Sequence, residues 1–364
     1  MFFWGIWIDF SCVAYYNKSR ITGKEIPMKF SAEKKASIKM YILEKISQNT
    51  EGLSKYVSQE LGISPNTVHS YLNELQNDQI IEKTKRDSYH LITKRYMYQL
   101  NRSAGDLEND TSAYEAYLHP LIAHFSDNIE QIWNYGMSEM VNNVIDHSQA
   151  EHLTIIIKQN YLFTQVMLID DGIGIFKKIK EHFSLLNLEE AICELVKGKL
   201  TTDADNHSGE GIFFTSKMMD SFFIFSDGKI FSTTKYENDQ ISDFPKLTCG
   251  TCVYMSLSNY THRSALEVFE QYSGDDGVFH KTRIPIKNIF DKAPISRSQA
   301  KRICNRLEQF KEVIVDFSET EWMGQGFAHQ LFVVYAKSHP QTIITPVNMN
   351  ANIENMYNHV KGSI

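Results

Sequence analysis

EMVNN at Glu139–Asn143, DDGIG at Asp170–Gly174 and GEG at Gly209–Gly211 follow one another in the central part of this chain. The first motif is expected on a helix, where Glu139 and Asn143 share one face and His147 continues it one turn later. The second motif follows two β-type runs, 153–157 and 166–169, and the third opens an apolar helix over 212–219. We therefore expect these three separate segments to form one ligand site.

The residue types in these motifs suit a nucleotide with magnesium. Asp170, at a strand end, can accept a hydrogen bond from the exocyclic amine of adenine. Gly172 and Gly174 let the backbone turn tightly beside a flat ring. Asn143 offers a neutral oxygen to Mg²⁺, which takes few protein ligands besides phosphates and waters. Glu139 can accept the proton of a water or hydroxyl that attacks the γ-phosphate.

The third motif and the segment before it suit the phosphates. Gly209 and Gly211, at a helix start, can present backbone N–H groups to them. Residues 176–208 contain an expected helix over 188–196 and a polar stretch, which is typical of a lid that closes over a nucleotide. The candidate phosphate contacts in this lid, with a solvated loop as the alternative, are Lys199, Thr201 and Thr202.

Taken together, the motifs resemble the GHKL family of ATP-binding domains, to which gyrase B, MutL, heat-shock chaperones, histidine kinases and anti-sigma-factor kinases belong. The resemblance covers roughly residues 110–260 and implies an α/β sandwich, the Bergerat fold, with ATP and Mg²⁺ as cofactors. Gly250-Thr251 match the family's late Gly-Thr, which implies that Thr251 lies near adenine. The residues with an implied role are Glu139 as the catalytic base, Asn143 as the Mg²⁺ ligand, and His147, Asp170, Gly172, Gly174, Gly209, Gly211 and Thr251 as nucleotide contacts.

The composition bounds the class of protein. A chain of 364 residues predicts two or three domains, and 42% hydrophobic with 22% charged residues is ordinary for a soluble globular protein. The formal net charge of −7 argues against a protein that coats nucleic acid with its whole surface, but allows one local basic module. The five scattered cysteines fit a reducing cytoplasm. Cys249 and Cys252 have CxxC spacing without a second pair, which favours strand packing over zinc or redox chemistry.

Residues 1–27 are unlike the rest of the chain. The apolar run 1–8 ends at Asp9, is too short to span a bilayer and has no basic residues before it, so no membrane partner is expected. We expect a disordered or wrongly assigned extension, with Met28 as the true start.

Residues 28–100 predict three helices and a hairpin, over 36–46, 53–61 and 65–77 and then 80–83 with 88–92. Gly62 is a helix stop, and Ser64 with Pro65 starts the third helix. This order resembles a winged helix-turn-helix, in which the third helix reads DNA and the hairpin is the wing.

The charge of residues 28–100 favours DNA as a partner. The segment holds 11 Lys or Arg and 8 Asp or Glu, a net charge of +3 in a chain of net −7. A winged helix used for protein contacts is the alternative. The expected base-reading residues are Asn66, Thr67, His69, Ser70 and Asn73, and the expected phosphate contacts are Lys83, Lys85 and Arg86.

A polar linker is expected over 101–112, followed by a helix over 113–135 that leads into the first motif. His119-Pro120 lies on that helix, but the acidic and paired-helix context of a histidine-kinase phosphoacceptor is missing. We therefore expect no phosphate transfer at His119.

Residues 261–364 predict a separate α/β unit. A helix over 296–310 capped by Ser296, a strand over 313–317, a helix over 324–335, a strand over 342–346 and a helix over 352–360 imply a parallel pair with a right-handed crossover. This resembles the STAS-like fold of anti-sigma-factor antagonists. Gln325 stands at the turn where phosphorylatable members carry a serine. Ser318 is a weaker candidate for phosphorylation.

The expected fold class is therefore multidomain α+β: a winged helix-turn-helix, a GHKL α/β sandwich over 113–260 and a C-terminal STAS-like domain over 261–364. The favoured hypothesis is a cytoplasmic, nucleotide-switched transcription regulator that hydrolyses ATP slowly. The alternatives are a serine/threonine protein kinase acting on a partner protein and an ATP sensor without turnover. The STAS-like part is expected to dock on a protein partner or within the chain, and a homodimer is a further hypothesis.

Overall fold

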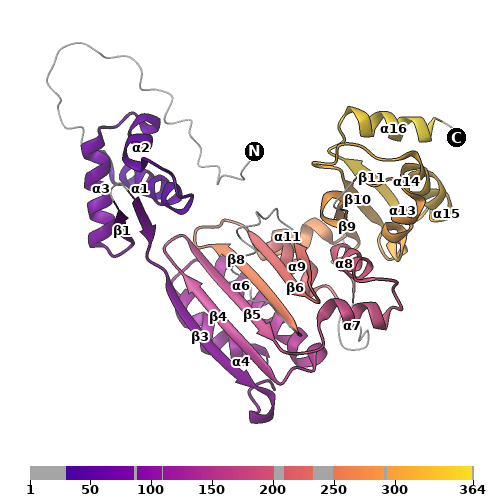
Figure 1. Ribbon diagram of the computed structural model, residues 1–364, viewed down its shortest axis with the longest axis horizontal. Helices are drawn as coiled ribbons and strands as arrows, with labels where there is room; N and C mark the ends of the chain where they lie inside the picture. The colour runs from indigo at the N-terminus through magenta and orange to yellow at the C-terminus, as the bar shows by residue number, and fades with distance from the viewer. Residues whose placement is uncertain are drawn as a thin grey trace. The chain divides into compact units, whose positions relative to one another are not determined.

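The computed structural model describes residues 30–85, 88–108, 110–200, 209–232, 249–274, 276–290 and 293–362. The protein is mixed α/β, and its described strands form sheets of two, three and six strands (Figure 1). The chain forms two compact units, residues 1–71 and 72–364. Their boundary falls inside helix α3 (Pro65–Asn77).

The first unit contains α1 (Ala32–Ser47), α2 (Leu53–Leu61) and the start of α3. The Ser31 side chain accepts a hydrogen bond from the Lys34 N–H and caps α1. Gly62 ends α2 in the left-handed conformation, at φ +61°, which confirms the expected helix stop. Ser64 Oγ then accepts from the Thr67 N–H at 3.1 Å and caps α3.

The expected hairpin is confirmed as two antiparallel strands, β1 (Ile81–Lys85) and β2 (Ser88–Leu91), in which Ile81 pairs with Leu91. Only residues 92–93 separate β2 from the next strand, β3 (Lys94–Asn101).

A six-stranded antiparallel sheet dominates the second unit, in the order β3-β4-β5-β8-β6-β7. Its other strands are β4 (His152–Gln159), β5 (Phe163–Asp170), β6 (Ser221–Ser226), β7 (Lys229–Ser232) and β8 (Thr251–Ser258). Edge strand β3 pairs with β4 along its whole length. Residues 94–101 thus belong to this sheet, and the expectation that 94–100 belong with the preceding hairpin is wrong. The expected linker begins with a 3₁₀ turn, η2 (Arg102–Ala104).

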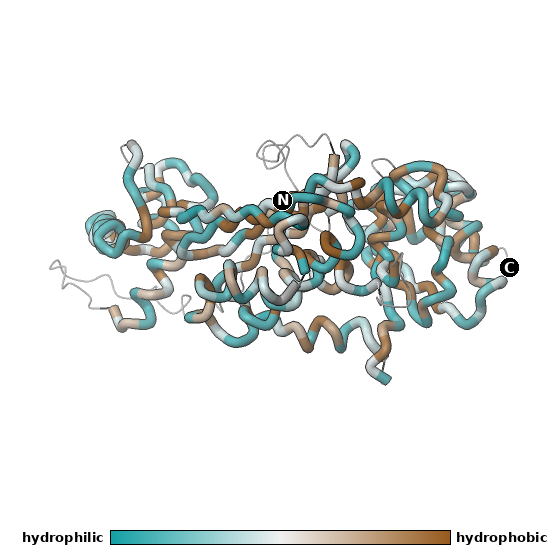
Figure 2. The backbone as a smooth tube through the Cα atoms, turned by 90° about the horizontal axis from the view of Figure 1, so that it is seen from below, coloured by the Kyte–Doolittle hydropathy of each residue, from teal (hydrophilic) through white to brown (hydrophobic). Residues whose placement is uncertain are grey.

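Helices cover one face of this sheet, so that sheet and helices form two layers (Figures 1 and 2). The helical layer includes α6 (Asp127–Asn142), α9 (Gly211–Met218) and α11 (Ala265–Tyr272). Alternate residues of each strand face these helices, as Ile155 and Ile157 of β4 do, and their side chains are fully buried in the core. The fully buried Trp133 of α6 belongs to the same core.

The helix expected over 113–135 is not continuous. It is divided into α4 (Asp110–Ala113), the π-helical η3 (Tyr114–Leu118) and α5 (His119–Ile122), and α6 begins after Ser126. Ser126 has extended backbone, at ψ 149°, which interrupts the helical hydrogen bonding. His119 lies 3.4 Å from a carboxylate oxygen of Glu115 and 3.7 Å from one of Glu130, so its ring is engaged by these two side chains.

Two helices, α7 (Ile175–His182) and α8 (Leu188–Lys197), follow β5. The side chain of Asn187 accepts from the Glu190 N–H at 3.0 Å and caps α8, and Gly198 ends it. The helix expected over 188–196 is thereby confirmed.

The third sheet is parallel, in the order β11-β10-β9, with strands β9 (Lys281–Pro285), β10 (Glu312–Asp316) and β11 (Ile343–Val347). The expected parallel pair is confirmed, and β9 is an additional strand that was not predicted. Its helices are α12 (Ile286–Ile289), α13 (Arg297–Cys304), α14 (Gln325–His329), α15 (Ala336–Ser338) and α16 (Ala351–Lys361), with η5 (Leu307–Gln309) and the π-helical η6 (Gln330–Tyr335).

Helix α13 ends earlier than the expected helix over 296–310. Ser296 and Gln299 form a capping box at its start, as the expected cap at Ser296 required. Arg306, two residues after its end, has left-handed backbone at φ +60°, which no α-helix can include.

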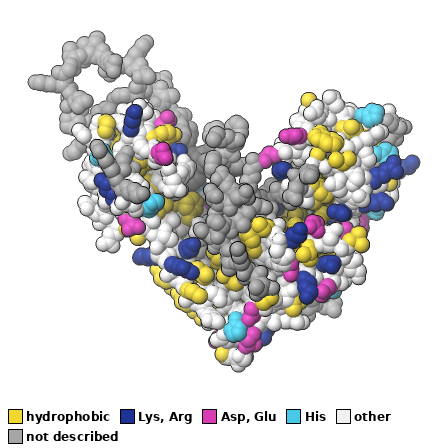
Figure 3. Space-filling model, viewed as in Figure 1, with side chains coloured by type: hydrophobic (Ala, Val, Ile, Leu, Met, Phe, Trp, Pro, Cys, Tyr) yellow, Lys and Arg dark blue, Asp and Glu magenta, His cyan; other side chains and the backbone are white. Residues whose placement is uncertain are grey.

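Within the described ranges, no helix is both long and apolar enough to cross a bilayer. On the face drawn in Figure 3, the described Lys and Arg side chains are interspersed with Asp and Glu.

Candidate functional site

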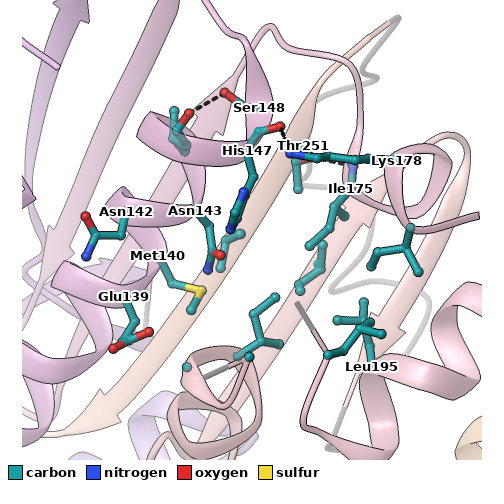
Figure 4. A pocket seen from close by; sticks show the side chains of 18 of the residues that line it. Glu139, Met140, Asn142, Asn143, His147, Ser148, Ile175, Lys178, Leu195 and Thr251 are labelled. Carbon is teal, nitrogen blue, oxygen red and sulfur yellow. Dashed lines mark hydrogen bonds between the residues drawn. The ribbon is translucent and has the colours of Figure 1, made fainter. Parts of the chain in front are cut away.

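Glu139, Asn143 and His147 all line one cavity of about 280 Å³. Helix α6 carries Glu139 and passes directly into the π-helix η4 (Asn143–Ser148), which carries the other two. Single π-helical turns within helices are frequent at functional sites, because the wider turn redirects side chains. In Figure 4 these three residues project from one side of the cavity. The shared face expected from their spacing is therefore present.

Asp170 is the buried acceptor of this cavity. It ends β5, the residue is 5% exposed, and burial raises the pKa of its carboxyl to about 6 from an ordinary value of 3.8. Hydrogen bonds from the backbones of Gly172 and Thr251 oppose that rise. A further hydrogen-bond donor would stabilise the ionised form of a carboxyl buried in this way.

The turn after β5 is shaped by glycine. The Gly172 N–H donates to Asp170 Oδ1 at 2.8 Å, and a side chain at 172 would collide with the Ser148 carbonyl oxygen. Gly172 thus orients the carboxylate from outside the cavity lining, whereas Gly174 lines the cavity. Gly174 has φ +84°, and a Cβ there would lie 2.7 Å from both carboxylate oxygens of Asp227. Both positions require glycine.

Thr251 stands beside this turn. Its Oγ1 accepts from the Ile175 N–H at 3.1 Å, and Ser226 Oγ accepts from the same N–H at 3.2 Å. Asp227 Oδ2 accepts from the Lys177 N–H at 3.0 Å. These bonds fasten the first turn of α7 to the ends of β6 and β8. Ser226 and Asp227 are positioning residues that were not predicted, because they lie in no motif.

Helix α9 begins at the cavity. Gly209 and Gly211 both line it, and a Cβ at 211 would collide with the Glu139 carboxylate. Gly209 has φ +72°, and its carbonyl accepts from the Leu200 N–H at 3.0 Å. Burial, with smaller contributions from the charges of Glu139 and Glu210, raises the pKa of Tyr135. The third motif, Gly209–Gly211, thus lies directly against the first motif, Glu139–Asn143.

The expected lid contacts have a different placement. Lys199 donates to the Gln309 carbonyl at 3.2 Å, and its ammonium lies over the rings of Phe279 and Phe310, at 5.5 and 5.3 Å. Burial lowers its pKa. Lys199 is therefore directed away from the cavity, which its neighbours Gly198 and Leu200 line. The other two candidates, Thr201 and Thr202, lie outside the described residues.

Two basic residues that no motif indicated support the cavity. Lys178 of α7 lines it and donates to the His147 carbonyl at 2.8 Å, as Figure 4 shows. Arg102 donates from Nε to the Ala150 carbonyl at 2.7 Å, and from one terminal nitrogen to the carbonyls of Val144 and Ile145, both at 3.1 Å. It thereby ties two carbonyl groups within η4 to one just beyond it.

Apolar side chains complete the cavity. Ile175, Ile224 and Val253 line it beside Asp170, while Leu195 and Ile212 line it near the start of α9. A cavity that combines apolar side chains with convergent polar groups suits a small molecule, and its volume lies just below the roughly 300–1,000 Å³ usual for such sites.

On α3, the residues expected to read DNA are mostly exposed. Asn66, His69, Ser70 and Asn73 are exposed, whereas Thr67 is half-buried and its hydroxyl lies 2.9 Å from Ser64 Oγ. Thr67 therefore belongs to the helix cap. In the hairpin Lys83 is exposed, and its ammonium lies 5.8 Å from the centre of the Tyr89 ring. The Lys85 side chain and Arg86 lie outside the described residues.

Ser318 is exposed just after β10, where its hydroxyl donates to Asp316 Oδ1 at 2.7 Å. Arg283 donates to the other oxygen of the same carboxylate at 2.7 Å, and Asn348 donates to Oδ1 at 2.9 Å. Gln325 opens α14. Cys252 is fully buried against Ile156 and Met167, which is the strand packing expected for it, and Cys249 is exposed.

A family model described as a STAS-like domain of unknown function (DUF4325) matches residues 299–354. These residues run from α13 through β10 and β11 into α16. Because β9 pairs with β10, we refer to residues 281–362 as the STAS-like domain. Among curated proteins, no sequence matches this chain.

Proposed function

We propose that the cavity binds ATP with Mg²⁺ and that the protein is a nucleotide-switched regulator built on a GHKL-type domain. One observation carries the proposal: residues from four distant segments, 139–147, 170–174, 209–211 and 250–251, converge on one cavity beside a buried carboxylate. The spacing of the motifs suggested this convergence, and neither the STAS-like match nor the composition required it.

The chemistry of the lining fits an adenine base. The Asp170 carboxylate is a buried acceptor for the exocyclic amine, and the apolar side chains of Ile175 and Val253 suit the faces of a flat ring. At the other end, the backbone N–H groups at the start of α9 suit phosphate oxygens. Asn143 would supply the protein oxygen for Mg²⁺, with phosphates and waters as its other ligands.

Glu139 is the candidate proton acceptor. It lines the cavity against the start of α9, where the phosphates are proposed to lie. A carboxylate within reach of an attacking water would accept its proton, which gives slow hydrolysis that resets the switch. If the attacking hydroxyl belongs to a partner protein, the same group would serve a serine/threonine kinase.

Helix α3 and the hairpin of β1 and β2 are the parts that we propose to bind the regulated partner. The exposed polar face of α3 and the exposed Lys83 favour DNA as the partner that the nucleotide state controls. A cytoplasmic location is part of the same proposal.

Incubation of the purified protein with ATP labelled at the γ-phosphate tests the function. We expect slow release of free phosphate that Glu139→Gln abolishes, with binding of a fluorescent ATP analogue retained. Glu130→Gln is the matched control, because Glu130 lies on the same helix but outside the cavity lining, beside His119. Labelled protein instead of free phosphate would favour the kinase. Binding without turnover would leave a sensor, and absence of binding would refute the proposed site.

A further inference from the structure

Helix α8 has two different neighbours. Leu195, Gly198 and Leu200, at and just beyond its end, line the cavity. The helix also packs against β9, α12 and α13 of the STAS-like domain. One short segment therefore forms a wall of the candidate site and a contact with the C-terminal domain, both within the second compact unit.

Lys197, the last residue of α8, is buried with its charge. Its side chain is 1% exposed, and its ammonium donates to Glu194 Oε1 at 2.7 Å, to the Arg302 carbonyl at 3.0 Å and to the Asn305 carbonyl at 2.6 Å. An ammonium has three N–H donors, so all of them are used. Two of the three acceptors belong to the STAS-like domain.

These bonds make each domain cap a helix of the other. The Arg302 carbonyl lies in the last turn of α13, where carbonyls lack helical partners and the helix dipole favours a positive charge. In return, Thr282 Oγ1 of β9 donates to the Lys197 carbonyl at the end of α8, at 2.6 Å. The STAS-like domain thus binds the end of α8 through both the side chain and the carbonyl of Lys197.

Further bonds extend this contact toward the cavity. Asn305 Nδ2 donates to Glu194 Oε1 at 3.1 Å, and Arg306 donates to the Lys199 carbonyl at 3.0 Å. Between Lys197 and Lys199, Gly198 has φ +83°, and a Cβ there would lie 3.0 Å or less from the rings of Phe213 and Phe279. The segment that joins the α8 contact to the cavity wall is therefore closely packed.

A buried ion pair is costly unless it is fully hydrogen-bonded, and it then favours one arrangement over others. We propose that the STAS-like domain is an intramolecular effector of the cavity: through Lys197 it holds α8 in the position that completes the cavity wall. Ligand binding and docking of this domain are then energetically coupled, and the coupling acts in both directions. Only the identity of the ligand, ATP, rests on the proposed function.

The test uses the full-length protein with both charges removed, as the double variant Glu194→Gln with Lys197→Met. The single Lys197→Met variant would leave the buried Glu194 carboxylate with Arg306, whose Nε lies 3.9 Å away, in place of its closest cation, and is therefore not suitable alone. Lys229→Met is the matched control, since it removes a 2.6 Å ion pair to Glu189 on the exposed side of α8, where both side chains are about half exposed. Hydrogen exchange read by mass spectrometry reports on α8, β9 and α13, and titration with a fluorescent ATP analogue reports affinity.

We expect faster exchange of residues 188–200 in the double variant, without ligand, and normal exchange in the control. We expect the Kd for the ATP analogue to rise roughly fivefold or more, because the cavity wall is no longer ordered in advance. ATP should also slow exchange at the end of α13 in the wild-type protein but not in the double variant. An unchanged or lower Kd, or unchanged exchange of 188–200, would overturn the proposal. If the wild-type protein binds no ATP, the proposed function fails, whereas exchange in the unliganded variants still decides whether Lys197 holds α8.

Discussion

Gly211 lies so close to Glu139 that a Cβ at position 211 would collide with the carboxylate of that side chain. The contact joins the start of α9 to the end of α6, two segments that are 72 residues apart in the chain. It also explains why position 211 needs the smallest side chain although its φ is not positive.

Gly211→Ala should impair the site more than the fold. The colliding atoms belong to the end of a flexible side chain, so Glu139 can swing aside at modest cost to stability, but it then leaves its place at the start of α9. We expect ATP turnover to fall at least tenfold, with a decrease in the free energy of unfolding of about 1 kcal/mol. Gly326→Ala is the control, because a Cβ there meets its neighbours at ordinary distances of 3.5 Å or more. Equal turnover in the two variants would contradict the assignment of Glu139.

Asp170→Asn should abolish ATP binding and yet stabilise the unliganded protein. A carboxyl whose folded pKa is raised to about 6 contributes stability below its unfolded pKa and loses that contribution as pH rises through 6. The stabilisation by Asn should therefore be largest at pH 8, at most roughly 3 kcal/mol, and should vanish near pH 4. Thermal unfolding across this pH range measures it.

Asp171→Asn is the matched neighbour with the opposite sign. Burial by itself would raise the pKa of Asp171, but hydrogen bonds from the backbone and ring of His152 outweigh it and hold the pKa low. Its contribution to stability is therefore present at neutral pH, and the Asn variant should be less stable there.

A destabilising effect of Asp170→Asn at pH 8 would contradict the account of that buried carboxyl.

Arg102→Met should weaken ATP binding from outside the cavity. Arg102 donates to two carbonyls within η4 and to one just beyond it, and loss of these hydrogen bonds should loosen that π-helix. We expect a decrease in unfolding free energy of about 1–3 kcal/mol, together with a higher Kd for ATP. Arg95→Met, at an exposed position of the same strand region, should change neither quantity. ATP affinity like that of the wild-type protein would show that Arg102 has no effect on the site.

Lys83→Ala should lower affinity for duplex DNA at all sequences and reduce the slope of log K against log salt by about one. Asn73→Ala, at an exposed position of α3, should instead reduce discrimination between sequences. Fluorescence anisotropy with labelled duplexes at several salt concentrations separates the two effects. If the wild-type protein binds no DNA, the alternative holds, in which residues 28–100 make protein contacts.

The sequence by itself determined the local elements that carry their own signals. Gly62, Ser64 and Ser296 act over one helical turn, so their effects on helix ends can be read from the chain. The motif residues at 139, 143, 170 and 211 were also predicted to share a site, because their spacing reports helix faces and strand ends. The STAS-like domain was predicted from its strand and helix order, and the family match supports it.

Only the tertiary structure decided which segments meet across long distances. Strand β3 joined the six-stranded sheet because its pairing with β4 is settled by partners more than 50 residues away, not by its neighbours in sequence. Lys199 turned away from the cavity because Gln309, Phe279 and Phe310 surround its ammonium. The burial of Lys197 depends likewise on carbonyl groups of a domain about 100 residues further along the chain. Such contacts leave no local pattern, since each partner alone has the sequence of an ordinary helix end.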